Sequence, residues 1–151
     1  MKTLAAMVLV SMLLSVTVAQ TPHIQPVKIT PTTRAFDISW VDNSTQRYYL
    51  ADRTNNAIDL VDAATDTFLG FIGKGQYTGS RPCPGQAKDL RHCSGPNGVI
   101  TDNLGHVWAG DGDGNIIEAD ATKPGTSIIR KIPTGGKFRV DELAYARCTN
   151  S

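Results

Sequence analysis

The sequence predicts an all-β protein made of about two four-stranded β-propeller blades and the start of a third. The main observation is an internal repeat, because residues 36–73 and 96–135 follow the same order of short apolar strands and polar turns. Aspartates keep step between the copies: Asp42 with Asp102, Asp52 with Asp111, and Asp62 with Asp120. Repeats of this kind are typical of propeller blades. Since closure needs more blades, we expect an incomplete propeller.

Each copy is expected to form one antiparallel sheet, because runs of strand-forming residues alternate with turn residues. In the first copy the strands are expected at 37–41, 47–51, 57–61 and 67–72. In the second copy they are expected at 98–101, 106–109, 116–119 and 127–132. We expect the two sheets to pack face to face as neighbours. The start of a third copy of the repeat is expected at Phe138.

The ends of the repeats define the rest of the domain organisation. Residues 1–19 are expected to be a signal peptide, since a basic start, a short apolar run and small residues follow one another. That run is shorter than the ~20 residues of a membrane span. Residues 20–33 contain three prolines and are expected to be a linker or edge strand, and residues 34–151 the partial propeller, with an inserted loop at 74–95. We therefore expect a secreted or periplasmic protein that does not span a membrane.

The charge balance argues against nucleic-acid binding. The chain has 15 basic and 14 acidic side chains, and removal of Lys2 with the signal peptide leaves 14 of each. Nucleic-acid and anionic-membrane ligands call for a basic excess. We expect a small molecule or a protein as ligand, with self-association through exposed blade edges as another possibility.

The inserted loop contains two cysteines, Cys83 and Cys93, in a segment rich in glycine and proline. In an oxidising compartment a disulfide that staples the loop is expected. The alternative is a metal site formed by Cys83, His92 and Cys93, although a second pair of ligands is missing. Cys148 is left without an assigned partner.

Two segments resemble known propeller repeats. The run YYLADRTNNAIDLVDAAT, at residues 48–65, resembles the secreted YVTN-type repeat. The run HVWAGDGDGNIIEADAT, at residues 106–122, is similar to NHL and SMP-30/gluconolactonase-like blades. The resemblance implies a propeller, of which this chain would be a short or truncated member. It implies no single activity, because such folds include lactonases, lyases and binding scaffolds.

Candidate metal ligands lie where the repeats begin. Asp37, Asn97 and Asp141 occupy corresponding places in the three starts, which converge on the channel of a propeller. Their oxygens suit a divalent metal such as calcium or zinc, and the resemblance to SMP-30-like lactonases implies a similar set. The alternative is that they end strands and satisfy loop backbone. The run Asp111–Asn115 resembles the opening of a calcium loop but fits a hairpin turn better.

The sequence favours a binding role over catalysis. His92 is the weak candidate for acid–base catalysis, because it lies on the inserted loop, whereas His106 lies in a strand and is expected to be packed or at a rim. The expected function is an exported β-propeller-type binding scaffold without a demonstrable catalytic site. The alternative is an SMP-30/gluconolactonase-like metal-dependent hydrolase, or a fragment of one.

Overall fold

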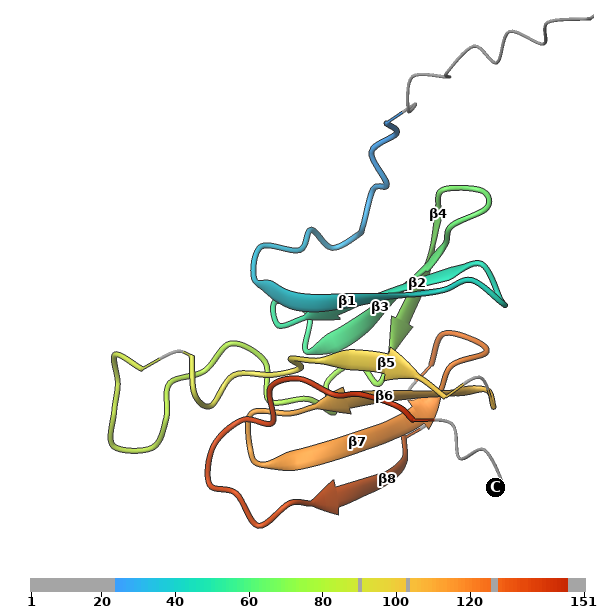
Figure 1. Cartoon of the computed structure of the whole chain (residues 1–151). Coiled ribbons are helices and arrows are strands. Elements are labelled where there is room, and N and C mark those ends of the chain that lie inside the picture. The colour runs from blue at the N-terminus through green and yellow to red at the C-terminus, as the bar shows by residue number, and fades with distance from the viewer. Residues whose placement is uncertain (1–23, 90, 103, 126–127, 147–151) are drawn as a thin grey trace, which may run out of the picture.

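The computed structural model describes residues 24–89, 91–102, 104–125 and 128–146, so the expected signal peptide and Cys148 lie outside the described residues. The strands form two four-stranded antiparallel sheets (Figure 1). In the first sheet the order is β1 (Phe36–Asp42), β2 (Arg47–Asp52), β3 (Ala57–Asp62) and β4 (Thr67–Ile72). In the second sheet it is β5 (Val99–Thr101), β6 (His106–Gly110), β7 (Asn115–Asp120) and β8 (Ile128–Pro133). The expected all-β architecture of two four-stranded units is confirmed.

The repeated aspartates begin the turns between strands. Asp42, Asp52 and Asp62 each accept a hydrogen bond through Oδ1 from the backbone amide two residues later, at 2.8 to 3.0 Å. This is the local bonding that makes aspartate a turn residue. Each of these turns ends in a residue with φ of 53°, and these residues are Gln46, Asn56 and Asp66. The regular recurrence of the aspartates therefore reflects one turn conformation that is repeated along the chain.

The second sheet uses the same design at two of its three aspartates. Asp102 accepts from the amide of Leu104 and Asp120 from that of Thr122, both at 2.8 Å. Asp111 instead accepts from the amide and hydroxyl of Thr78, at 3.0 and 2.9 Å. Asp111 thus ties the second sheet to the loop that follows β4.

The apolar core lies between the two sheets. The first sheet contributes alternate residues of β2 and β3, including Tyr49 and Leu60, and the second contributes Val107 and Ile117, all of them buried. Alternation of this kind is what a strand with one face against a core requires. The Trp40 indole also donates to the hydroxyl of Thr101 across the two sheets at 3.0 Å. The sheets therefore pack face to face, as expected.

The segment after β8 runs back along the second sheet without becoming a strand (Figure 1). The amide of Val140 donates to the carbonyl of Asp111, and the amide of Gly98 donates to the carbonyl of Asp141. A Cβ at Gly98 would lie 2.3 Å from that carbonyl oxygen, so the close approach requires glycine there. The expected third start is thus an extended segment fixed against the second sheet. Within the described residues, no helix has the length and apolar character needed to cross a bilayer.

Candidate functional site

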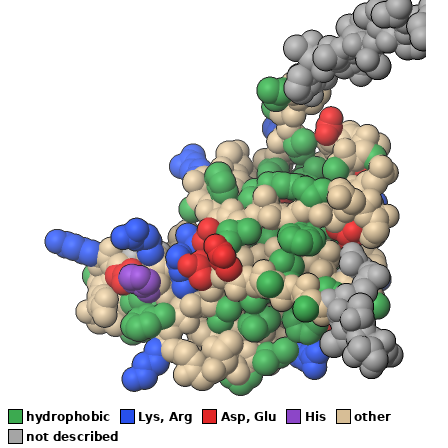
Figure 2. Space-filling view, in the orientation of Figure 1, with side chains coloured by type: hydrophobic (Ala, Val, Ile, Leu, Met, Phe, Trp, Pro, Cys, Tyr) green, Lys and Arg blue, Asp and Glu red, His purple; other side chains and the backbone are tan. Residues whose placement is uncertain are grey.

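The three residues predicted to bind a metal come together, and arginines lie between them. Arg53 ion-pairs with Asp37, and its Nη2 also donates to Oδ1 of Asn97 at 2.5 Å. Arg139 places Nη2 at 2.8 Å from Oδ2 of Asp141 and Nη1 at 3.8 Å from Oδ2 of Asp37. Figure 2 shows acidic and basic side chains side by side near the base of the inserted loop. Guanidinium groups thus supply the positive charge that a metal would supply.

Asn97 is the buried member of this group. Its Nδ2 donates to the carbonyl of Val140 at 3.0 Å, while its Oδ1 accepts from Arg53. These contacts join the first sheet, the start of the second sheet and the segment after β8. The cluster fixes the three starts of the repeat against one another, and a metal-binding role for Asp37, Asn97 and Asp141 stays a prediction.

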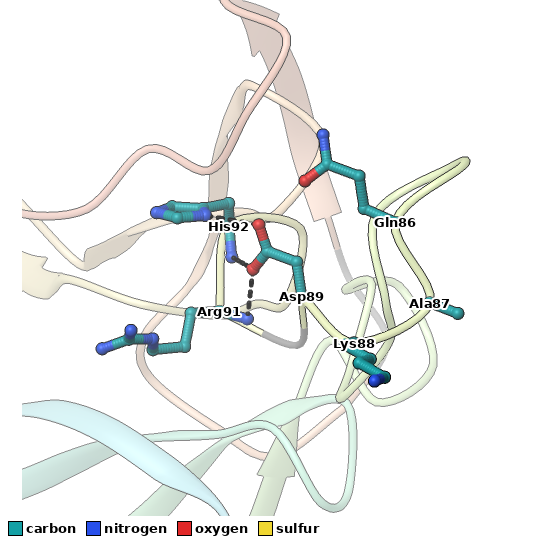
Figure 3. A pocket seen from close by; sticks show the side chains of 6 residues that line it. All are labelled: Gln86, Ala87, Lys88, Asp89, Arg91 and His92. Carbon is teal, nitrogen blue, oxygen red and sulfur yellow. Dashed lines mark hydrogen bonds and ion pairs between the residues drawn. The ribbon is translucent and has the colours of Figure 1, made fainter.

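The inserted loop carries an open hollow of about 630 Å³, drawn in Figure 3. It is lined by Gln86, Ala87, Lys88, Asp89, Arg91 and His92. Cys83 and Cys93 form the expected disulfide beside it. Since both sulfurs are bonded to each other, neither is a thiolate, and the alternative metal site with His92 is wrong for the oxidised chain.

His92 is held in one orientation by Asp89. Its Nδ1 lies 2.6 Å from Oδ2 of Asp89, and Oδ1 of Asp89 accepts from the amides of Arg91 and His92 at 3.1 Å. The hydrogen bonds from the His92 side chain and then from its amide lower the pKa of Asp89 to about 2. Asp89 is therefore ionised at neutral pH. Two cations, Lys88 and Arg91, line the same hollow as the exposed imidazole, and cationic side chains suit an anion.

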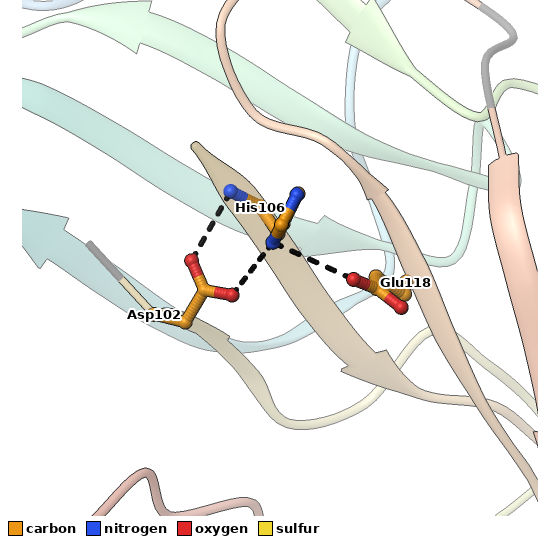
Figure 4. A group of neighbouring side chains, drawn as sticks. All are labelled: Asp102, His106 and Glu118. Carbon is orange, nitrogen blue, oxygen red and sulfur yellow. Dashed lines mark hydrogen bonds and ion pairs between the residues drawn. The ribbon is translucent and has the colours of Figure 1, made fainter. Parts of the chain in front are cut away.

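A second cluster, formed by Asp102, His106 and Glu118, was missed from the sequence (Figure 4). One ligand atom from each lies within 4.8 Å of the others, so the group could hold a metal ion. Nδ1 of His106 lies 2.8 Å from Oδ2 of Asp102 and 3.5 Å from Oε1 of Glu118. Trp108 of β6 pairs with Glu118 of β7, and His106 lies on the same face of β6 as Trp108. This strand register is the signal that could have placed Glu118 near His106.

The carboxylates of this second cluster are already engaged. The Trp108 indole donates to Asp102 at 3.1 Å, and Arg130 ion-pairs with Glu118. Burial raises the pKa of Asp102, but hydrogen bonds from the Leu104 amide, Trp108 and His106 together hold it below the ordinary value. A metal ion would have to displace these donors. The cluster therefore serves first to fix His106 and Trp108 on the outer face of the second sheet.

The glycine-rich run from Asp111 to Asn115 adopts a turn between β6 and β7. Gly114 has φ of 80°, and Oδ1 of Asp113 accepts from the amide of Asn115 at 3.3 Å. Oδ1 of Asp111 accepts from the amide and hydroxyl of Thr78, outside this run. The hairpin interpretation fits this geometry, and the calcium-loop interpretation does not.

Protein-family models, curated proteins and solved structures were each compared with this chain, and none matches. The resemblance to secreted propeller repeats accordingly stays a prediction from the sequence. The disulfide is consistent with an oxidising extracellular location.

Proposed function

We propose that the protein is an exported β-propeller-type binding scaffold whose ligand site is the hollow on the inserted loop. The propeller part of this proposal is supported by matching strand registers. Trp40 pairs with Tyr49 and Tyr49 with Leu60, just as Ile100 pairs with Trp108 and Trp108 with Glu118. Trp40 lies two positions before Asp42, and Ile100 lies two positions before Asp102. The two sets of paired residues therefore occupy the same place in the two copies of the repeat.

The matching faces have different surroundings. In the first sheet this face is buried against the second sheet. In the second sheet it borders an apolar hollow of about 290 Å³, lined by Ile100, Trp108, Ile116 and Ile132 with residues 143–145. In a propeller, each blade packs one face of its sheet against the preceding blade and the other face against the following blade. The residues after β8 lie where the next blade would begin.

A groove of about 400 Å³ adds support for the same arrangement. It is lined by residues 38–40 of β1, residues 98–100 around β5, and residues 142–143. The three starts of the repeat thus border one groove. In a propeller the first strands of successive blades line the central channel.

The binding role rests on one observation, a hollow lined by charged side chains on a loop closed by a disulfide. Lys88, Arg91 and His92 line it, and Asp89 holds His92 in place. A loop fixed before binding loses less conformational entropy when the ligand arrives. The side chains suit a small ligand that bears carboxylate or phosphate groups.

Calorimetric titration of the full chain with citrate and inorganic phosphate tests this role. We expect Arg91→Ala and Lys88→Ala each to weaken binding about tenfold, because a hydrogen bond to a charged group contributes about 1.5–3 kcal/mol. Lys123→Ala is the matched control, since Lys123 is an exposed cation in the turn after β7. Binding that is unchanged in the Lys88→Ala/Arg91→Ala double variant would contradict the proposal.

The convergence of Asp37, Asn97 and Asp141 favours a second candidate, an SMP-30/gluconolactonase-like metal-dependent hydrolase. A divalent cation such as calcium or zinc would have to replace Arg53 and Arg139 among these oxygens. Titration with calcium, zinc and manganese, on wild type and on Asn97→Ala, tests it. The hydrolase proposal predicts that Asn97→Ala loses metal at this site, and tight binding unaffected by the substitution would refute the placement.

A further inference from the structure

Two aspartates meet on the face of the first sheet that points away from the second sheet. Asp52 ends β2 and Asp59 lies in β3, and both are fully buried. The segment before β1 covers them through Thr33, whose Oγ1 lies 2.6 Å from Oδ2 of Asp52 and 3.3 Å from Oδ2 of Asp59. Three oxygen atoms from three parts of the chain therefore converge at one buried point.

Hydrogen-bond donors are distributed unequally between the two carboxylates. Asp52 accepts through Oδ1 from the amides of Thr54 and Asn55, and through Oδ2 from Nδ2 of Asn55 and from Thr33. A threonine hydroxyl has a single hydrogen. At 2.6 Å that hydrogen lies closer to Asp52, so the contact of Thr33 with Oδ2 of Asp59, at 3.3 Å, is the weaker of the two.

Asp59 is consequently short of partners. Among the described residues, its Oδ1 has no hydrogen-bond donor, although the atom is buried. Of the charged groups that act on Asp59, Asp52 repels its negative form and Lys74 attracts it. A buried carboxylate oxygen without a donor is rare in proteins and calls for an ion or a water at that point.

We propose that Asp52, Asp59 and Thr33 form a binding site for a hard divalent cation, for which calcium is the best fit. Calcium takes six to eight oxygen ligands in flexible geometry and completes its shell with water, whereas zinc prefers nitrogen and sulfur. Two carboxylates match its charge. Rotation of the Asn55 amide, whose side chain already contacts Asp52, adds a fourth oxygen.

The cation would fasten the segment before β1 to the first sheet. That segment contributes Thr33, and also the carbonyl of Pro31, which lies 3.3 Å from Nδ2 of Asn55. A bound ion would replace the proton that the two carboxylates otherwise share. This site is separate from Asp37, Asn97 and Asp141, and it does not depend on the anion-binding role of the inserted loop.

Calorimetry and thermal unfolding of the full chain at pH 8, after treatment with a chelator, test the site with calcium alone. We expect one calcium per chain with a Kd of about 10⁻⁴–10⁻³ M, as in extracellular modules, and a higher unfolding midpoint. Magnesium at the same ionic strength should bind at least about tenfold more weakly, because it demands near-ideal octahedral geometry.

Variants locate the ion. Asp59→Asn should weaken calcium binding at least about tenfold, because it removes one of the two carboxylates. Asp62→Asn is the matched control, since Asp62 begins an equivalent turn but is paired with Arg47. Thr33→Val leaves both carboxylates in place and should also weaken binding, which keeps the test decisive if Asp59→Asn does not fold.

Three results would overturn the proposal. The first is no calcium binding by wild type at about 10 mM, which is well above the expected Kd. The second is unchanged binding in both Asp59→Asn and Thr33→Val. The third is loss of calcium in Asn97→Ala with retention in Asp59→Asn, which would place the ion at Asp37, Asn97 and Asp141 instead.

Discussion

The hydroxyl of Tyr49 donates a hydrogen bond to the carbonyl oxygen of Ala121 across 3.2 Å. Tyr49 lies in β2 of the first sheet, and Ala121 follows β7 of the second, so this bond crosses the core between the sheets. Both residues are buried, and they border a hollow of about 220 Å³ between the two sheets. The bond links the two repeats of the chain directly.

Tyr49→Phe is expected to lower the free energy of unfolding by about 1 kcal/mol, because it removes this bond and keeps the ring. Tyr49→Ala should cost about 3–5 kcal/mol, since it also leaves a cavity. Urea unfolding of each variant measures both effects. Tyr48→Phe is the control, because Tyr48 lies on the other face of the same strand, and a larger loss there than in Tyr49→Phe would contradict the prediction.

The stability of the chain should depend on pH through Asp59. Burial, followed by the negative charge of Asp52, raises the pKa of Asp59 to about 8, and Thr33 and Lys74 only partly oppose this. Between the unfolded value near ~4 and the folded value, the folded state holds more protons, so the free energy of unfolding falls as pH rises. We expect Asp59→Asn to remove this loss.

Unfolding with urea at pH 5 and pH 8, in the presence of a chelator, measures this effect. Wild type should lose more stability between the two pH values than Asp59→Asn does. Asp62→Asn serves as the control and should keep the wild-type slope, because the low pKa of Asp62 lies outside this window. Equal slopes for wild type and Asp59→Asn would show that Asp59 is not protonated in the folded chain.

The disulfide should contribute to stability by closing a short loop. Cys83 and Cys93 are ten positions apart, and replacing both with alanine should lower the free energy of unfolding by about 2–3 kcal/mol. The measurement is chemical unfolding of the double variant beside the oxidised and reduced wild type. Equal stability of oxidised and reduced wild type would contradict the prediction.

Asp102→Ala is expected to lower the free energy of unfolding by about 1–3 kcal/mol, because the half-buried Trp108 and His106 side chains and the turn amides lose a buried acceptor. Asp120→Ala is the matched control in the equivalent exposed turn, where water replaces the lost bonds, and its cost should be smaller. Unfolding followed by tryptophan fluorescence measures both variants. A larger loss for Asp120→Ala would reverse the assignment.

Local features of the fold were predictable from the sequence. The strands were expected within one or two residues of their observed limits, because turn aspartates and alternating apolar residues act over short distances. The convergence of Asp37, Asn97 and Asp141 followed from their equal places in the repeat. The positions of the arginines between them could not be predicted in this way. Arg53 and Asn97 are 44 positions apart, and their contact depends on how the two sheets pack.

Burial of polar groups was harder to foresee. Asp59 stands in the strand sequence AIDLVD, where a polar residue is expected to face water. It is buried because the segment before β1 folds over it through Thr33. Glu118 escaped notice for a similar reason, because Arg130 and His106 reach it from neighbouring strands. Contacts of this kind depend on tertiary packing, which strand periodicity does not encode.

Amide chemical shifts of the isotope-labelled chain, recorded during titration with citrate, test the ligand-binding role of the inserted loop most directly. We predict progressive shifts at the lining residues 86–89, 91 and 92, with small changes in the two sheets. The same titration of Lys88→Ala/Arg91→Ala should leave these shifts nearly unmoved, while Lys123→Ala responds as wild type does. Shifts confined to the sheets, or no shifts at all, would contradict a binding scaffold that uses this loop.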